Sequence, residues 1–234
     1  ELVCPQKPEV WEFYAAVFKE LKDIFPSGTV HLGGDEAPTE LWGKCPLCRE
    51  ARTKTGMKDE QEQMRAFFAK TTVLLAKNGQ TPQFWYEGNA GIYHPGETVY
   101  AWRQDQALQS IEKTKKAGLN LIMASNEYCY LDFPQIQGQR NWGWMKTTTL
   151  QKCYELDPAF GKPEKEAGHI RGVHAPVWAE RLPDLDHLLY RAYPRACAIA
   201  EAGWSPMSAR SWENFRRKLA DHRQFILKRF NYDM

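Results

Sequence analysis

Two adjacent carboxylates, Asp35 and Glu36, are the residues of this sequence best placed for acid–base chemistry. They follow the short run Thr29-Val-His-Leu32, which is typical of a strand, and the pair Gly33-Gly34. Like charges in contact push their pKa values apart, so one carboxyl stays ionised while the other keeps its proton. That division suits a site in which one group stabilises positive charge and the other transfers a proton.

The geometry of a regular strand opposes this reading, because neighbouring side chains of a strand point to opposite faces. Glycine tolerates bulges and unusual dihedrals, so Gly33 and Gly34 provide a way to turn both acids toward one side. The alternative is a strand that ends in a solvated acidic turn. His31, within the strand, is expected to be a structural core histidine.

The elements that position these acids follow from hydrophobic periodicity. The sequence predicts helices at about 8–25, 60–77, 105–117, 185–203 and 211–229. Strands are predicted at 29–36, 81–87, 98–103, 119–125 and 170–178, and irregular loops at 37–58 and 133–168. Alternating strands and helices indicate a parallel sheet, and in a barrel of this kind the active site lies at the carboxyl ends of the strands. A doubly wound open sheet fits the strand count too, but no glycine-rich phosphate loop follows any strand.

Composition narrows the class of partner. The chain has 234 residues, 43% of them hydrophobic and 26% charged, with a net charge of +2, which is ordinary for a folded domain. Neither nucleic acid nor a membrane is therefore expected as a partner, and no apolar run approaches the roughly 20 residues of a membrane-spanning helix. Nine tryptophans favour sugar binding, because apolar ring faces of sugars lie flat on indole.

The six cysteines give a weaker signal. Cys45-Pro-Leu-Cys48 has the spacing of a zinc knuckle, but no second pair with that spacing exists. We therefore expect a loop with free or bridged thiols rather than a zinc site, and we predict neither a metal nor a cofactor.

The stretch from His31 to Glu36 resembles the His-x-Gly-Gly-Asp-Glu signature of family 20 glycoside hydrolases, the β-N-acetylhexosaminidases. Later landmarks of that family are matched in the same order, by Trp85-Tyr-Glu87, Trp102-Arg103, Tyr130-Leu-Asp132, Trp178-Ala-Glu180 and Ala200-Glu-Ala-Gly-Trp204-Ser-Pro206. The resemblance implies an α/β fold, a (β/α)8 TIM barrel of which this chain supplies about the last five strand–helix units, strands 4–8. Residues 1–234 are then expected to be a partial catalytic barrel domain whose strands 1–3 lie upstream.

The resemblance also implies a mechanism. Relatives release terminal β-linked N-acetylglucosamine or N-acetylgalactosamine with retention, and the substrate's own acetamido oxygen forms an oxazolinium intermediate. Glu36 is expected to be the general acid and base, while Asp35 accepts from the acetamido N–H and Tyr130 donates to the acetamido oxygen. The expected sugar-binding residues are the pocket walls and two hydroxyl acceptors, namely Trp85, Trp102, Trp178, Asp132 and Glu180.

The expected partner is a small carbohydrate, the terminal N-acetylhexosamine of a glycan or chitooligosaccharide. The resemblance suggests a secreted, periplasmic or lysosomal location, and the oligomeric state is left open.

Two alternative functions remain, a metal-dependent barrel hydrolase that uses His31 and Asp35, and a non-catalytic fragment that binds N-acetylhexosamine. Trp142 and Trp144 either form a wall near the leaving group or pack their loop down. Arg103 is expected to pair with Glu87 or Asp105.

Overall fold

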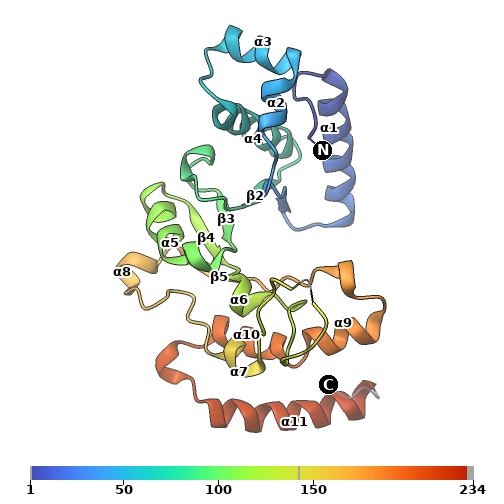
Figure 1. The fold of residues 1–234 in the computed structure, drawn as a ribbon, viewed down its shortest axis with the longest axis vertical. Coiled ribbons are helices and arrows are strands. Elements are labelled where there is room, and N and C mark those ends of the chain that lie inside the picture. The colour runs from blue at the N-terminus through green and yellow to red at the C-terminus, as the bar shows by residue number, and fades with distance from the viewer. Residues whose placement is uncertain (1, 142, 231–234) are drawn as a thin grey trace. The chain divides into compact units, whose positions relative to one another are not determined.

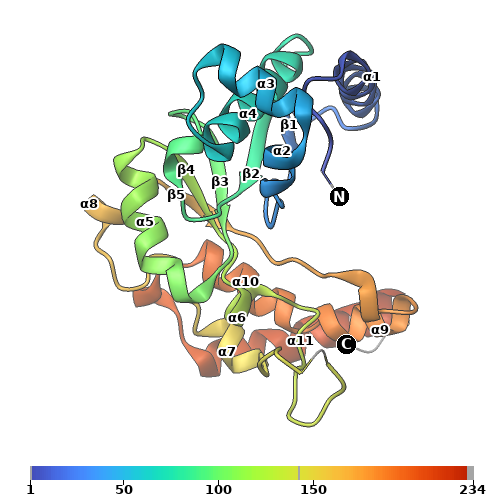
Figure 2. The same cartoon turned by 45° about the horizontal axis from the view of Figure 1, so that its top comes forward.

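The computed structural model describes residues 2–141 and 143–230, which divide into two compact units (Figures 1 and 2). The first unit contains residues 1–100 and 112–120, and the second contains 101–111 and 121–234. No helix in the described ranges has the length and apolar character needed to cross a membrane.

The first unit is built from strands that pair in parallel and helices that connect them. Its elements are α1 (Pro8–Ile24), β1 (Thr29–His31), α2 (Glu40–Lys44), α3 (Pro46–Thr55), α4 (Glu60–Ala76), β2 (Thr81–Trp85), the 3-10 turn η1 (Ala90–Ile92) and β3 (Thr98–Ala101). β1 pairs with β2 and β2 with β3, with Val30 opposite Pro82 and Phe84 opposite Val99. α4 packs on α1 and on β2, and buries Phe68 and Leu75.

The second unit continues the alternation. Its elements are η2 (Gln104–Gln106), α5 (Ala107–Lys116), β4 (Asn120–Met123), α6 (Asn126–Cys129), α7 (Leu150–Tyr154), α8 (Glu164–Ala167), β5 (Ile170–Val173), η3 (Ala179–Arg181), α9 (Leu185–Ala192), α10 (Arg195–Trp204), η4 (Met207–Ala209) and α11 (Trp212–Phe230), of which α5 and β4 extend into the first unit. β4 and β5 are parallel. α10 packs on α7 and β5 (Figure 1). Ile199 of α10 and Phe215 of α11 belong to the same buried cluster.

Three expectations about local structure were wrong. Residues 37–58 are not an irregular loop but contain α2 and α3. Pro46 occupies the first turn of α3, where its missing N–H costs nothing, and Gly56 ends the helix with φ 73° in the left-handed region. The predicted loop 133–168 likewise contains α7 and α8. The helix predicted at 185–203 is interrupted at Tyr193-Pro194, because the residue before proline is disfavoured in the helical region.

The remaining elements confirm the predicted order. Each predicted strand is present, although each is shorter than predicted and ends before its polar residues. The acidic candidates, and all aromatic candidates except Trp85, therefore lie in the segments that follow strands, whereas Trp85 is the last residue of β2. Parallel pairing with intervening helices in both units confirms the α/β class.

Candidate active site

The turn after β1 carries Asp35 and Glu36 through a run of left-handed backbone. Gly33 has φ 70°, Gly34 has φ 95° and Glu36 itself has φ 48°. A Cβ atom on Gly34 would lie 2.7 Å from Cζ of Phe68, a ring that is 2% exposed in the core. Glycine at this position is thus required both by its dihedral and by the close approach of Phe68. The backbone thus leaves the extended conformation at Gly33, directly before the two acids.

Asp35 is half-buried and Glu36 is exposed. Glu36 is one of two non-glycine residues in the described ranges with a positive φ, and such a residue is uncommon. Backbone strain of this kind gathers at functional sites because the surrounding structure must hold it in place. Here Gly34 packs closely against Phe68, which fixes the backbone two residues before Glu36.

Trp85 ends β2 and is 7% exposed. The Tyr93 hydroxyl donates to the Trp85 carbonyl at 2.7 Å and accepts from the Glu87 backbone N–H at 3.4 Å. Burial raises the pKa of Tyr93, and the negative charges of Glu87 and Asp35 raise it further. Tyr93 therefore holds the last residue of β2 to the turn that follows it. Sequence reasoning missed it, since it lies in a segment without strand or helix periodicity.

His31 is exposed, so its expected place in the core was wrong. Its Nδ1 accepts from the Gly33 backbone N–H at 3.1 Å, and its ring lies edge-on to the rings of Trp85 and Tyr100, with centroids 4.9 and 4.7 Å away. The imidazole thus supports the first residue of the glycine turn and packs beside Trp85.

In the second unit, the segments that follow β4 and β5 are held together. The Leu131 backbone N–H donates to the Pro176 carbonyl at 2.9 Å, and the rings of Tyr130 and Trp178 lie 6.1 Å apart. Tyr130 is 7% exposed and Trp178 is 38% exposed, so Trp178 offers an open indole face beside a buried phenol. The structure therefore brings these two predicted site residues together.

Asp132 lies in a pocket of the same unit with Trp178 and Glu180. Burial raises the pKa of Asp132 to about 6, and the negative charge of Glu180 contributes in the same direction. Its Oδ1 atom is buried and accepts no hydrogen bond from any described residue. An unsatisfied buried carboxylate oxygen is costly, and a ligand hydroxyl would satisfy it.

Arg140 and Asn141 line this pocket too, and neither was predicted. They come from a loop without periodicity, so no sequence signal pointed to them. Their donors lie beside the acceptors of Asp132 and Glu180, so hydrogen-bonding groups of both kinds line this pocket. Trp144 is 65% exposed and its ring packs edge-on against Phe133 at 5.5 Å, whereas Trp142 lies outside the described residues.

Trp102 follows β3 and belongs to the second unit. The guanidinium of Arg103 stacks over its indole, 4.1 Å from the ring centroid, and the Asn126 backbone N–H donates to the Trp102 carbonyl at 2.8 Å. Arg103 thus has a cation–π contact that was not foreseen, and its pairing with Glu87 or Asp105 stays a prediction. Asp35, Glu36 and Trp85 belong to the first unit, and the other candidates belong to the second.

Comparison with known proteins identifies relatives along most of the chain. The model of the glycosyl hydrolase family 20 catalytic domain matches residues 1–207. A beta-hexosaminidase of Akkermansia muciniphila is 93% identical over 234 residues, which are 100% of this chain and 48% of that protein. A beta-hexosaminidase of Porphyromonas gingivalis is 28% identical over 225 residues, which are 94% of this chain and 28% of that protein. The chain therefore spans about half or less of the length of these curated relatives.

Solved structures of family 20 enzymes are similar to this chain as well. The crystal structure of a beta-N-acetylhexosaminidase with 93% identity superposes with a TM-score of 0.97 and covers 100% of this chain and 50% of that one. The GH20 exo beta-N-acetylglucosaminidase from Vibrio harveyi, in complex with N-acetylglucosamine, is 25% identical with a TM-score of 0.87 and covers 100% of this chain and 37% of that one. The predicted fold class, part of a (β/α)8 barrel, is confirmed.

Proposed function

The chain belongs to the catalytic domain of glycosyl hydrolase family 20, and from this premise we propose that the protein is a retaining exo-β-N-acetylhexosaminidase. It releases terminal β-linked N-acetylglucosamine or N-acetylgalactosamine, and residues 1–234 form the later part of its barrel, strands 4–8. The observation that carries the proposal is the left-handed turn at Gly33, Gly34 and Glu36, which redirects two adjacent acids at the end of a barrel strand.

Glu36 is the general acid in this proposal and protonates the oxygen of the leaving group. Its exposure suits a group that must then exchange its proton with water when it acts as the base. Asp35 accepts from the N–H of the substrate's acetamido group and stabilises the positive charge that develops on it. The acetamido oxygen attacks the anomeric carbon, breaks the glycosidic bond and forms an oxazolinium ion, which water then opens with net retention.

Tyr130 donates its hydroxyl hydrogen to the acetamido oxygen. Trp85, Trp102 and Trp178 wall the pocket and hold the acetamido group in its attacking position, an effect of proximity. Trp85 suits this role because it is almost fully buried and its backbone is held by the Tyr93 hydroxyl.

Asp132 and Glu180 accept from sugar hydroxyls. The buried, unsatisfied Oδ1 of Asp132 supports this assignment, because a sugar without the matching hydroxyl would leave it unpaired. Ionisation of Asp132 strengthens the bond it accepts, so affinity for N-acetylglucosamine should rise as the pH rises through about 6. The predicted secreted, periplasmic or lysosomal location is part of the proposal and rests on the family alone.

The test compares two classes of leaving group in the whole protein. Glu36→Gln should lower kcat by roughly 100- to 10,000-fold on substrates with poor leaving groups, and much less on activated aryl glycosides. Glu50→Gln is a matched control, because that exposed side chain pairs with Lys54 on α3. Equal losses on both substrate classes would overturn the acid role of Glu36. A thiazoline mimic of the oxazolinium ion should bind tightly, and failure to bind would refute participation of the acetamido group.

A further inference from the structure

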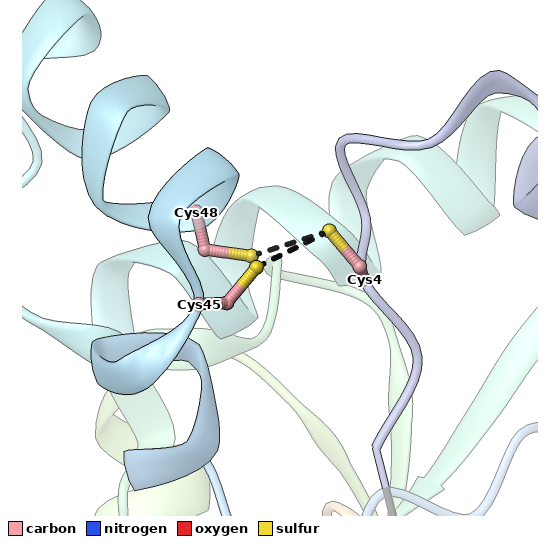
Figure 3. Close-up of side chains that lie close together, drawn as sticks. All are labelled: Cys4, Cys45 and Cys48. Carbon is pink, nitrogen blue, oxygen red and sulfur yellow. Dashed lines mark hydrogen bonds between the residues drawn. The ribbon is translucent and has the colours of Figure 1, made fainter.

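In the first unit, Cys4 meets Cys45 and Cys48, which lie 41 and 44 positions further along the chain (Figure 3). The Sγ atom of Cys4 lies 3.7 Å from that of Cys45 and 3.6 Å from that of Cys48. Cys4 precedes α1, Cys45 lies between α2 and α3, and Cys48 lies in the first turn of α3. The fold thus adds a third thiol to a pair whose spacing alone gave only a weak signal.

The distances match a metal site better than a disulfide. A disulfide holds its sulfur atoms about 2.05 Å apart. Thiolates bound to tetrahedral zinc lie about 2.3 Å from the metal, so their sulfur atoms lie about 3.8 Å apart. The two measured separations are close to that tetrahedral edge. All six cysteines are free thiols in the structure.

The Cys45–Cys48 half of the site is organised by the start of α3. The Cys48 backbone N–H donates to the Cys45 thiol. Pro46 fixes the first turn of the helix between the two cysteines. Cys48 is fully buried, so packing holds its thiol beside the other two.

The Cys4 half is held by two tryptophans. The Trp42 indole N–H donates to the Val3 carbonyl at 2.8 Å, and the Trp11 indole N–H donates to the Pro5 carbonyl at 2.7 Å. Both indoles are buried, at 2% and 9% exposed. The residues on either side of Cys4 are therefore fixed before any ligand binds, as supporting hydrogen bonds fix the ligands of metal sites.

We propose that Cys4, Cys45 and Cys48 together bind one Zn²⁺ ion, with a water molecule or a small thiol as the fourth ligand. Soft thiolate ligands select zinc over hard cations such as magnesium or calcium. On binding, each thiol gives up its proton, three thiolate–zinc bonds form and no electron is transferred. The ion ties the segment before α1 to the junction of α2 and α3. Its role is structural, and it takes no part in glycoside cleavage.

The test measures metal in the whole protein, purified under reducing conditions and loaded with zinc. Elemental analysis should find one equivalent of zinc per chain, and cobalt loading should give the thiolate-to-cobalt charge-transfer absorption of a tetrahedral site. Removal of zinc with a strong chelator should release one equivalent and lower the Tm, while alkylation of the three thiols becomes faster.

Variants assign the ligands. Cys4→Ser and Cys48→Ser should each abolish stoichiometric binding, whereas Cys197→Ser, a half-buried cysteine on α10, should keep it. If Cys48→Ser does not fold, the alkylation pattern of the unmutated protein decides instead, since zinc should protect Cys4 and Cys45 in particular. Substoichiometric zinc after loading would overturn the proposal, and so would a Cys4–Cys45 or Cys4–Cys48 disulfide as the main state of the reduced preparation.

Discussion

Replacement of Gly34 by alanine tests whether packing against Phe68 fixes the turn that carries the two acids. The added methyl group would lie 2.7 Å from Cζ and 3.2 Å from Cε1 of the Phe68 ring, well inside van der Waals contact. Phe68 has no free direction in which to retreat, because it is 2% exposed and its ring centroid lies 4.3 Å from that of Phe84. Either the ring or the turn must move.

The expected cost has two parts. A non-glycine residue in the left-handed region costs about 1–2 kcal/mol, and forcing an extra methyl group into a packed core costs about 1–3 kcal/mol. Gly34→Ala should therefore lower the free energy of unfolding by roughly 2–5 kcal/mol. Gly33→Ala is the matched control, because its φ is also positive but its Cβ would meet only Asp35 Oδ1 at 3.8 Å, an ordinary contact. Gly33→Ala should therefore lower the free energy of unfolding only by the cost of the left-handed backbone, about 1–2 kcal/mol.

Urea unfolding of the two variants gives the comparison, and a double-mutant cycle isolates the clash. Phe68→Leu removes ring atoms that the new methyl group would meet, so Gly34→Ala should cost less in that background, with a coupling of about 1–2 kcal/mol. Activity should fall with the same pattern, because displacing a catalytic group by about 1 Å costs roughly 100-fold. Equal destabilisation by Gly33→Ala and Gly34→Ala, or strict additivity with Phe68→Leu, would refute the packing argument.

Three further substitutions probe residues around the candidate site. The unmutated protein should lose stability as the pH rises from about 4 to 6, because ionising the buried Asp132 carboxyl destabilises the fold. The Asp132→Asn variant has no such carboxyl, so its stability relative to the unmutated protein should rise over this range by on the order of 1–3 kcal/mol after solvent screening. Arg195→Met should lower the free energy of unfolding by about 2–4 kcal/mol, since the fully buried guanidinium donates to the Leu131 carbonyl at 2.5 Å. Tyr93→Phe should cost about 0.5–1.5 kcal/mol by removing the bond to the Trp85 carbonyl, and all three are measured by urea unfolding.

Exposed residues provide controls for two of these changes. Asp186→Asn on α9 should show no comparable change with pH, and Arg217→Met on α11 should leave stability within about 0.5 kcal/mol. A stability difference for Asp132→Asn that stays flat between pH 4 and pH 6 would contradict the raised pKa of Asp132. A loss for Arg195→Met no larger than that for Arg217→Met would contradict the importance of the buried guanidinium.

Much of the fold was predictable because its strongest signals are local. Helices α1 and α4 have long apolar stripes and clear stops, at Pro26 and at Asn78-Gly79, and their bounds were found within a residue or two. The two helices α2 and α3 were missed because they are short and largely polar, with only Trp42 and Cys48 buried. Periodicity needs several turns to appear, so a short helix started by proline is hidden from it.

The candidate site, like the fold, contains some residues that the sequence pointed to and others that it did not. Motifs pointed to Asp35, Glu36, Tyr130 and Trp178 as candidates, because their residue types follow predicted strands in a recognisable order, and their roles stay predictions. The groups that hold them in place were not predicted. Tyr93 donates to Trp85 across a turn that has no strand or helix periodicity, and the Cys4 and Cys48 thiols meet across 44 positions. Hydrophobic periodicity contains no information on either contact.

The segment Tyr130-Leu-Asp132 shows why motif and position are separate questions. Its first and last side chains have the proposed roles, but the central carbonyl, that of Leu131, is held by Arg195 at the start of α10. The same guanidinium also donates to the Thr148 carbonyl at 2.8 Å, and burial lowers its pKa to about 10. A buried arginine with no acidic hydrogen-bond partner among the described residues is expensive, unless several carbonyls satisfy its donors in a fixed geometry. The cost of burying Arg195 is therefore offset by contacts that also fix the backbone between Tyr130 and Asp132. The placement of these two proposed site residues thus depends on a residue that belongs to no motif.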